Sequence, residues 1–224
     1  MNIDEKFKNF ELFVHRRYLA RFIVRYELFK KIMNIEGSII ECGVWNGGGV
    51  LAWGKLSEIF EPYAIKRKII GFDTFEGFPH VNDKDKGKNL NPNVKKGAFK
   101  PENSTYDEIL SSIEIFNNER YLNQFNKIEL VKGDALRTIP DFVNENNHLI
   151  VALLFLDFDL YEPTKVALET LLPRVPKGGI VAFDEINNPG WPGETMALVE
   201  QIATLNKIEI RKFHFDANIA YITI

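Results

Sequence analysis

This chain has little cysteine, no long apolar run and almost no net charge. Its single cysteine, Cys42, excludes an internal disulfide. No apolar run reaches the roughly 20 residues of a membrane-spanning helix. The opening MNIDEKFKNF also lacks the basic and apolar stretches of a signal peptide. We therefore expect a soluble, cytoplasmic protein with no membrane attachment.

The near balance of charge narrows the partners as well. Lys and Arg total 28 and Asp and Glu total 31 in the 224 residues, so the net charge is −3. This balance argues against binding to nucleic acid. The hydrophobic share of 45% is enough for a full core, and the length suits a single domain. We therefore favour chemistry on a small molecule.

Residues 3–34 show helical periodicity. Apolar side chains recur there at mostly three- and four-residue intervals. The basic residues between them are Arg16, Arg17, Arg21, Arg25, Lys30 and Lys31. A basic amphipathic helix can lie on a membrane, but the broad aromatic stripe favours packing against the core or a second subunit. We assign residues 1–37 to an N-terminal helical segment and residues 38–224 to the main domain.

From Ser38 onward, short apolar runs alternate with helix-like segments. The runs are SIIECGV, KIIGFD, IELVKGD, LIVALLFLD and GGIVAFDE, and the segments between them include residues 48–60, 135–146 and 163–172. KIEIRKF and IAYITI are typical of a closing antiparallel hairpin. The pattern predicts an α/β fold with a mostly parallel sheet and helices on both faces. Residues 74–104, rich in Gly, Pro, Asn and Lys, predict a long loop that is either a lid or a solvated insertion.

Residues that could bind a nucleoside cofactor follow the first strands. In an open parallel sheet the ligand lies beyond the carboxyl ends of the strands. Glu41 ends the first strand before the glycine-rich turn GVWNGGGV, and Asp73 ends the second at about the 20-residue spacing of a ribose-binding acid. Trp45 stands where a dinucleotide motif has its second glycine, which disfavours a pyrophosphate. Glu41 suits a cationic amino-acid tail instead, so S-adenosylmethionine fits best.

The third strand adds an acidic residue, Asp134, as an acceptor for the adenine amino group. Each of these acids taken alone is more often a loop or helix-capping residue, but together they follow the order of the strands. The expected cofactor-binding residues are Glu41, Gly43, Val44, Trp45, Gly47, Asp73, Thr74, Phe75, Asp134 and Ala135.

The fourth and fifth strands end in further carboxylates. Asp157 and Asp159 follow the fourth strand, and Asp184 and Glu185 follow the fifth. Carboxylates that converge without a cation raise one another's pKa, and their hard oxygen atoms suit Mg²⁺. We expect Asp157, Asp184 and Glu185 to bind Mg²⁺, and Asp157 to accept the proton of a hydroxyl group.

Helix capping is the structural alternative for these acids. Asp184 and Glu185 could cap the segment after Asn187, and Asp159 could bond to the start of the helix near Pro163. Cys42 and the histidines show no metal-ligand or nucleophile pattern. His80, in the long loop, is the only histidine that we consider for substrate contact.

Several segments resemble one enzyme family. They are IIECGVWNGGGVLAW, GFDTFEGFP, IELVKGDALRTIPDF, LLFLDFDLYEPTKVALETLLPRVPKGGIVAFDEI and PGWPGETMAL. These segments, from about Ser38 to Val199, are similar to the macrocin O-methyltransferase (TylF-type) family of S-adenosylmethionine-dependent enzymes. The resemblance implies a class I methyltransferase, Rossmann-like fold, a homodimer, and Mg²⁺-dependent O-methylation of a sugar or sugar-containing natural product.

The same resemblance implies roles for individual residues. Glu41, Gly43, Asp73 and Asp134 fall on its cofactor positions, and Asp157, Asp184 and Glu185 fall on its metal positions. Three residues depart from the pattern. Phe158 stands where the family commonly has a small residue, Glu185 replaces a second aspartate, and Thr74 replaces a serine.

Two competing hypotheses remain. The first is a metal-dependent glycosyltransferase that uses Asp157 and Asp159 as a D-x-D motif, which leaves the glycine turn and Asp73 unexplained. The second is a non-catalytic adenosine-binding module. The clustered acids weigh against the second, because clustered charge without a metal stabilises nothing.

Overall fold

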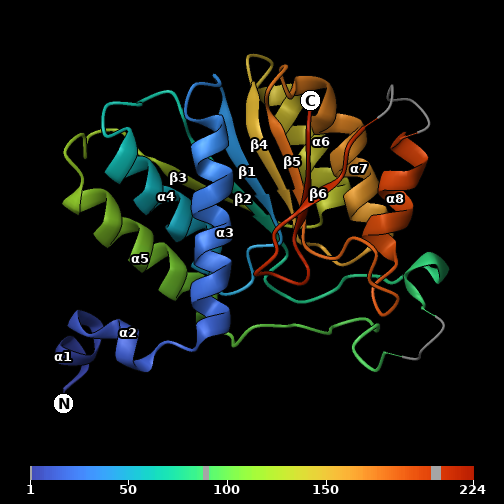
Figure 1. Ribbon diagram of the computed structural model, residues 1–224, viewed down its shortest axis with the longest axis horizontal. Coiled ribbons are helices and arrows are strands. Elements are labelled where there is room, and N and C mark those ends of the chain that lie inside the picture. The colour runs from blue at the N-terminus through green and yellow to red at the C-terminus, as the bar shows by residue number, and fades with distance from the viewer. Residues whose placement is uncertain (1, 88–90, 203–207) are drawn as a thin grey trace.

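A seven-stranded sheet forms the centre of the computed structural model, which describes residues 2–87, 91–202 and 208–224 (Figure 1). The strands are β1 Ser38–Cys42, β2 Ile69–Asp73, β3 Ile128–Lys132, β4 Val151–Leu156, β5 Ile180–Phe183, β6 Arg211–Lys212 and β7 Ala220–Thr223. Their order is β3-β2-β1-β4-β5-β7-β6. Strands β1 to β5 are parallel, and β7 is antiparallel to both β5 and β6. The predicted α/β fold with its closing antiparallel pair is confirmed.

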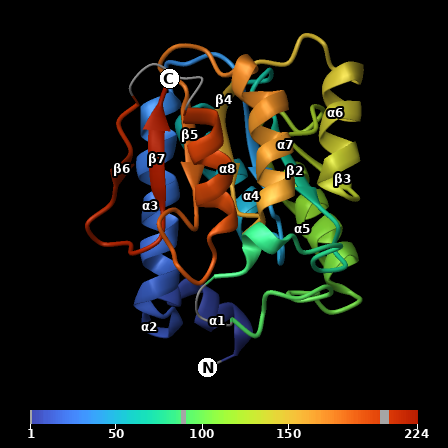
Figure 2. The same cartoon turned by 90° about the vertical axis from the view of Figure 1, so that its right-hand side faces the viewer.

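Helices cover both faces of the sheet (Figures 1 and 2). One layer contains α3, α4 and α5 and lies toward the left in Figure 1, and the other contains α6, α7 and α8 and lies toward the right, facing the viewer in Figure 2. Their bounds are α3 Arg16–Ile32, α4 Gly48–Phe60, α5 Thr105–Glu119, α6 Ala135–Glu145, α7 Tyr161–Leu171 and α8 Gly193–Ile202. Because both faces are covered, every residue of β1 and β4 is buried.

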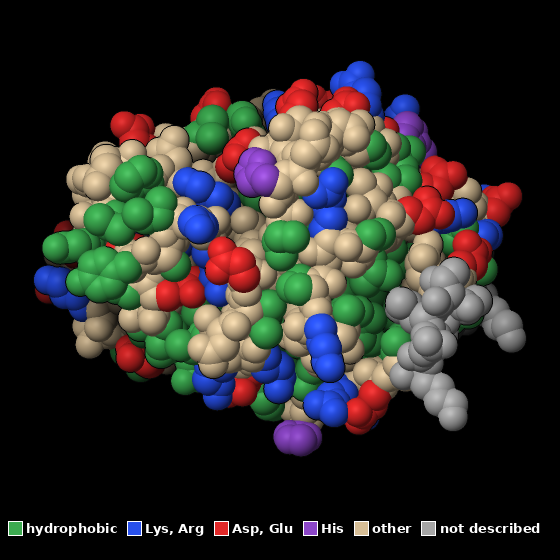
Figure 3. Space-filling model, turned by 90° about the horizontal axis from the view of Figure 1, so that it is seen from above, with side chains coloured by type: hydrophobic (Ala, Val, Ile, Leu, Met, Phe, Trp, Pro, Cys, Tyr) green, Lys and Arg blue, Asp and Glu red, His purple; other side chains and the backbone are tan. Residues whose placement is uncertain are grey.

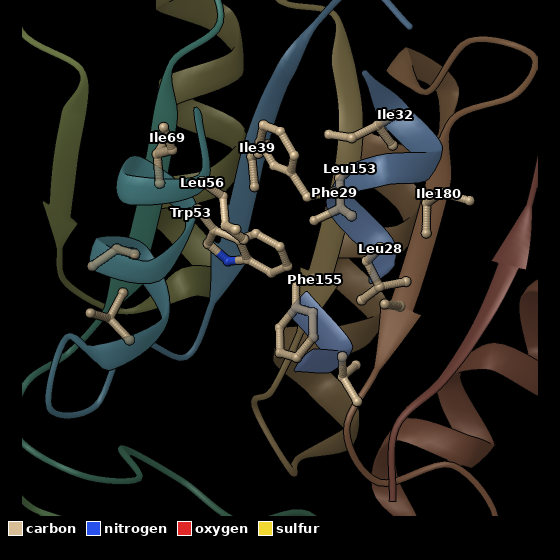
Figure 4. Close-up of a cluster of buried hydrophobic side chains, with 14 of the residues drawn as sticks. Leu28, Phe29, Ile32, Ile39, Trp53, Leu56, Ile69, Leu153, Phe155 and Ile180 are labelled. Carbon is tan, nitrogen blue, oxygen red and sulfur yellow. The ribbon is translucent and has the colours of Figure 1, made fainter. Parts of the chain in front are cut away.

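The core between the sheet and the layer of α3, α4 and α5 is the more aromatic of the two (Figure 4). Trp53 of α4 packs edge-on against Phe155 of β4, with 5.9 Å between ring centroids. Leu28 and Phe29 of α3 are fully buried beside them. Burying each such side chain contributes about 1.5–3 kcal/mol, so α3 is fixed firmly onto the sheet at this point.

The N-terminal segment is not one helix. The apolar pattern over residues 3–34 predicted a continuous helical stretch, but the structure has α1 Ile3–Lys8, α2 Phe10–Phe13 and then α3. The His15 ring accepts a hydrogen bond from the Arg17 amide and caps α3. Only α3 has a core to pack against, since α1 and α2 bury no residue. The domain boundary at residue 37 stays a prediction, and α3 shares its core with the sheet.

Two other segments differ from expectation. Residues 105–119, for which no element was predicted, form α5, whose Ile109, Ile113 and Phe116 face the core. KIEIRKF yields only the two-residue β6, and Lys207 lies outside the described residues. The loop 74–104 contains a single 3-10 turn, Asp83–Asp85, among its described residues.

The strand ends are held in register where the site forms. The Asp157 amide donates to the Cys42 carbonyl at 2.8 Å, and the Asp184 amide donates to the Leu156 carbonyl at 3.0 Å. Gly43 has a φ of +94°, and a Cβ there would lie 2.0 Å from the Asp157 carbonyl oxygen. Glycine is therefore required where β1 and β4 end side by side.

The molecular surface agrees with the balanced composition. Seen from above, acidic and basic side chains are interspersed over the face at the amino ends of the parallel strands (Figure 3). Among the described residues, no helix is long and apolar enough to cross a membrane.

Candidate active site

A cavity of about 800 Å³ lies at the carboxyl ends of the parallel strands. It brings together most of the residues that the sequence indicated. The predicted residues that line it are Glu41, Gly43, Val44, Trp45, Asp73, Thr74, Asp134, Ala135, Asp157, Asp184 and Glu185. Gly47 instead lines an adjoining groove, and Phe75 is buried with its ring 4.7 Å from that of Tyr106.

Glu41 is the most buried carboxylate on the cofactor side. It is 1% exposed, and burial raises its pKa to about 7 despite the opposing effect of Arg25. Oε1 lies 3.6 Å from Arg25 Nη2, and Oε2 accepts no hydrogen bond from any described residue. A buried acceptor without a donor is costly. An ammonium group of a bound ligand would supply that donor, so Glu41 fits the predicted cofactor.

Asp73 organises the turn after β1. Its Oδ2 accepts the amides of Val44 and Trp45, both at 2.8 Å, and its Oδ1 accepts the amide of Phe75 at 2.7 Å. A carboxylate oxygen can accept two hydrogen bonds, so Oδ1 keeps one free position. A ribose hydroxyl can use it without disturbing the turn.

Asp134 has two partners of its own. Its Oδ1 caps α6 by accepting the Leu136 amide at 3.0 Å, which is the capping role considered for it from the sequence. Its Oδ2 lies 2.9 Å from His80 Nε2 in the long loop. The loop thus contacts the carboxylate that we expect to meet the adenine.

Arg21 of α3 bridges the carboxylates of Asp157 and Asp184. Its Nη2 lies 2.7 Å from Asp184 Oδ1 and 3.3 Å from Asp157 Oδ2. Burial alone would lower the pKa of Arg21, but the charges of these two carboxylates outweigh that effect, and the pKa is raised above its usual value. Burial, followed by the charges of Asp184 and Asp159, raises the pKa of Asp157 well above its usual value. A single guanidinium therefore only partly neutralises this group of acids.

The arrangement does not fit a magnesium ion as it stands. No three His, Cys, Asp or Glu side chains in the described part of the chain are placed to hold a metal ion. Glu185 accepts a hydrogen bond from Asn188, and Arg21 stands between Asp157 and Asp184. The donor types are those that Mg²⁺ prefers, but the position of the cation is taken by an arginine.

Glu194, at the start of α8, joins the two acidic strand ends. Its Oε1 accepts the amides of Phe158 and Asp159, both at 3.1 Å, and its Oε2 accepts the amide of Glu185 at 3.0 Å. Its side chain is fully buried. One carboxylate therefore sets the spacing between the segments that carry Asp157 and Asp184.

The capping alternatives for the acidic pairs are wrong. The amide at the start of α7, that of Tyr161, donates at 2.6 Å to Asp85 from the long loop and not to Asp159. Asp159 has a φ of +60°, so the chain turns sharply there. Helix α8 begins at Gly193, away from Asp184 and Glu185 in the chain. Among the hydrogen bonds of the described residues, none has Asp159, Asp184 or Glu185 capping a helix.

An aromatic wall closes the cavity on the loop side. We use this name for Phe78 and Phe99 of the long loop together with Trp191, whose ring centroids lie 5.4–5.9 Å apart. Asn91 also donates to the Gly190 carbonyl at 3.3 Å. The long loop and the loop before α8 thus meet over the acidic strand ends.

Sequence reasoning missed three residues that line this cavity, Arg21, Arg25 and Trp191, and also the buried Glu194. The arginines carried a signal, because Arg17, Arg21 and Arg25 recur every four residues and so project from one face of the helix. Glu194 and Trp191 lie in PGWPGETMAL, where nothing separates them from ordinary loop and helix residues.

The chain matches the family model described as Macrocin-O-methyltransferase (TylF) over residues 26–222. It is 28% identical over 151 residues to the 8-demethyl-8-(2,3-dimethoxy-alpha-L-rhamnosyl)-tetracenomycin-C 4'-O-methyltransferase of Streptomyces olivaceus. That match covers 67% of this chain and 53% of the relative. The chain spans about half the length of the curated relatives that it matches.

Two solved structures are similar over the whole chain. The crystal structure of a calicheamicin methyltransferase has a TM-score of 0.93 and 32% identity, and the match covers 100% of this chain and 86% of that one. The apo structure of a TDP-rhamnose 3'-O-methyltransferase of calicheamicin biosynthesis has a TM-score of 0.81 and 30% identity, over 100% and 87% of the chains. The match to the family model covers most of this chain. The protein therefore belongs to the macrocin O-methyltransferase (TylF) family.

Proposed function

We propose that this protein transfers the methyl group of S-adenosylmethionine to a hydroxyl group of a sugar or a sugar-containing natural product. One observation carries the proposal. The same cavity holds Glu41, a buried carboxylate with an unused acceptor, and Asp157, a carboxylate whose pKa is raised. The first suits the ammonium group of the cofactor, and the second suits the proton of the acceptor.

The residues at the ends of β1 to β3 would hold the cofactor. Glu41 receives the ammonium group, the free position on Asp73 Oδ1 receives a ribose hydroxyl, and Asp134 receives the adenine amino group. The turn fixed by Asp73 places the Val44 and Trp45 amides beside the cavity. The cofactor would therefore be held by residues at the ends of β1, β2 and β3.

Asp157 would act as the general base. S-adenosylmethionine supplies a methyl group on a sulfonium, and the acceptor oxygen takes it as the carbon–sulfur bond breaks and a neutral thioether leaves. Asp157 accepts the hydroxyl proton, so charge does not build up on the oxygen. Burial and the neighbouring acids raise the pKa of Asp157 above its usual value, which makes it a stronger base than an ordinary carboxylate.

The acceptor is proposed from the relatives and from the aromatic wall. The names of two relatives contain rhamnosyl and TDP-rhamnose, and we propose a rhamnose-like sugar as the acceptor of this chain. The apolar face of such a ring would stack on Trp191 and Phe99 while its hydroxyl groups face the acidic strand ends.

The expected Mg²⁺ dependence also remains a proposal. Asp157, Asp184 and Glu185 would be the ligands, in an arrangement where Arg21 no longer lies between the two aspartates. A divalent ion would supply Lewis-acid stabilisation of negative charge on the acceptor oxygen. The proposed role of Asp157 as the general base does not depend on the ion.

The predicted homodimer has a feature in its support. Helices α1 and α2 bury none of their residues, and Phe7 and Leu12 are 70% and 72% exposed. Apolar side chains in this state are typical of a surface that a second subunit covers. Light scattering of the full chain should give twice the monomer mass, whereas the monomer mass would contradict the prediction.

Calorimetry would separate the proposed activity from the glycosyltransferase hypothesis. We expect S-adenosylmethionine and S-adenosylhomocysteine to bind the metal-free protein, and UDP-glucose not to bind. Binding of UDP-glucose in place of the adenosyl compounds would contradict the proposal.

A further inference from the structure

The position of Arg21 leads to an inference about the cation site. We propose that Arg21 is a built-in cation that competes with a divalent metal ion for Asp157 and Asp184, so that the ion pairs of Arg21 and the bound metal exclude each other. This inference rests on the metal-binding part of the proposed function. It does not rest on methyl transfer itself.

The exclusion follows from geometry. A single nitrogen atom, Arg21 Nη2, contacts one oxygen of each aspartate, at 2.7 Å and 3.3 Å. A magnesium ion that bridges the same two oxygens must lie about 2.0–2.1 Å from each of them. It would therefore occupy the region between the oxygens that the guanidinium now fills. Two positive charges at that separation would also repel each other strongly.

The acids around Arg21 explain why a second cation can still compete. Asp157 and Asp184 carry the direct contacts, and Asp159 and Glu185 line the same cavity. One guanidinium leaves this group with an excess of negative charge. A divalent ion brings twice the charge of a guanidinium to the same oxygen atoms, so it can compete with Arg21 for them.

Arg21 can leave without disturbing α3. The buried anchors of that helix are Val24, Leu28, Phe29 and Ile32, all C-terminal to Arg21. The Arg21 side chain itself is 26% exposed and lies in the cavity. A long, partly solvated side chain can change its rotamer while the helix stays in place.

Arg17 provides a matched control. It lies one turn earlier on α3 and lines the same cavity, with its guanidinium 5.4 Å from the Tyr18 ring. Among the described residues, Arg17 forms no ion pair with an acidic side chain. Neutralising Arg17 therefore changes the net charge as much as neutralising Arg21 does, but leaves the aspartate pair bridged.

The test measures the affinity of the full chain for Mn²⁺ in the absence of cofactor, by electron paramagnetic resonance or calorimetry. We expect Arg21→Gln to bind Mn²⁺ about tenfold more tightly than the unchanged protein, because the metal no longer competes with the guanidinium for the two aspartates. Arg17→Gln should stay within about twofold, as expected for screened charge. Equal or weaker binding by Arg21→Gln, or equal gains in both variants, would overturn the proposal.

A second measurement needs no variant. Titration of the unchanged protein with Mg²⁺, followed by NMR of the arginine side chains, should shift the Arg21 signal toward that of a free guanidinium while the Arg17 signal stays. Binding of Mg²⁺ at the aspartates without a shift of Arg21 would overturn the proposal. Binding of S-adenosylmethionine, measured on the same samples, reports on the proposed function separately. A result that contradicts the competition between Arg21 and the metal can therefore be distinguished from a result that contradicts cofactor binding.

Discussion

Arg25 Nη2 lies 3.6 Å from Glu41 Oε1, although both side chains are largely buried. This separation is too long for a hydrogen bond, and it explains why burial still raises the pKa of Glu41 to about 7. Arg25 also stacks over Phe155, with 5.5 Å from its guanidinium carbon to the ring centroid, which holds it at that distance. The carboxylate is thus left incompletely paired, and a ligand cation can complete it.

Cofactor binding should therefore depend on pH through Glu41. Below pH 7 the free protein holds a proton on Glu41, and this proton must leave before an ammonium group can pair with the carboxylate. We expect the affinity for S-adenosylhomocysteine to rise about tenfold between pH 5.5 and pH 7.5. Glu41→Gln should weaken binding and remove most of this dependence. Calorimetry at both pH values checks this, and the same slope in Glu41→Gln would exclude Glu41 as its source.

The stability of the free protein should respond in the opposite direction. Glu41 holds its proton more tightly in the folded chain, where its pKa is about 7, than in the unfolded chain, where the value is 4.5. Its contribution to folding is therefore largest below the lower value and is lost as the pH rises toward 7. Urea denaturation of the protein and of Glu41→Gln between pH 5 and pH 7 should show a smaller decline for the variant. Parallel curves would contradict this reading.

Asp157→Asn should abolish turnover and spare the cofactor. Loss of a general base typically lowers the rate by about 10²–10⁴-fold, while the ends of β1 to β3 remain intact. Asp159→Asn is the matched control, since its side chain makes no described ion pair with Arg21. We expect it to lose less than about tenfold, because no proton transfer is assigned to it. Methyl transfer and S-adenosylhomocysteine affinity are measured together, and unchanged turnover in Asp157→Asn would remove Asp157 from the mechanism.

Glu194→Gln should destabilise the fold. In the variant an amide NH₂ group replaces one carboxylate oxygen, so a donor faces a backbone N–H donor. Leaving such a buried donor without an acceptor costs about 1–3 kcal/mol. Glu200→Gln, on the same helix, changes a carboxylate that is 41% exposed and that pairs with Lys84 and Lys165. Its hydrogen bond from the Tyr161 hydroxyl can still be accepted by the amide oxygen. Exposed ion pairs contribute little to stability, so we expect a smaller loss than in Glu194→Gln. Urea denaturation gives both values, and equal stability of the two variants would show that Glu194 does not join the strand ends.

Trp191→Ala should affect the acceptor and not the cofactor. The Trp191 ring packs 5.7 Å from that of Phe99 and lines the cavity. Loss of a stacking surface should raise the KM for a sugar acceptor about tenfold or more, with little change in S-adenosylhomocysteine affinity. Tyr121→Ala, which removes an exposed ring paired with Tyr63, is the control. An unchanged KM in Trp191→Ala would place the acceptor elsewhere.

The sheet and its strand-end acids could be predicted from local patterns. Each strand is a short apolar run, and β4 is buried along its full length, so its sequence needs no alternation. Glu41, Asp73 and Asp157 end their strands directly, and parallel strands bring their carboxyl ends to one edge. Their meeting in one cavity followed from topology alone.

The contacts between distant segments could not be predicted in this way. Arg21 meets Asp184, and Asp85 meets the Tyr161 amide, across large separations in sequence. A periodic pattern states which face of a helix is buried, but it does not state which charge lies opposite each charge. The break of the N-terminal helix at Asn9 and His15 has a similar cause, because the pattern continues where the supporting core does not.

The central claim is methyl transfer to a sugar hydroxyl, and one measurement tests it directly. The protein is incubated with S-adenosylmethionine carrying a ¹³C-labelled methyl group and with TDP-rhamnose or a rhamnosylated natural product, with and without Mg²⁺. The account predicts S-adenosylhomocysteine and a ¹³C methyl ether on a sugar oxygen by NMR, in equal amounts, and neither product with Asp157→Asn. A label on an atom other than a hydroxyl oxygen, or no transfer to any of these acceptors by protein that binds the cofactor, would contradict it.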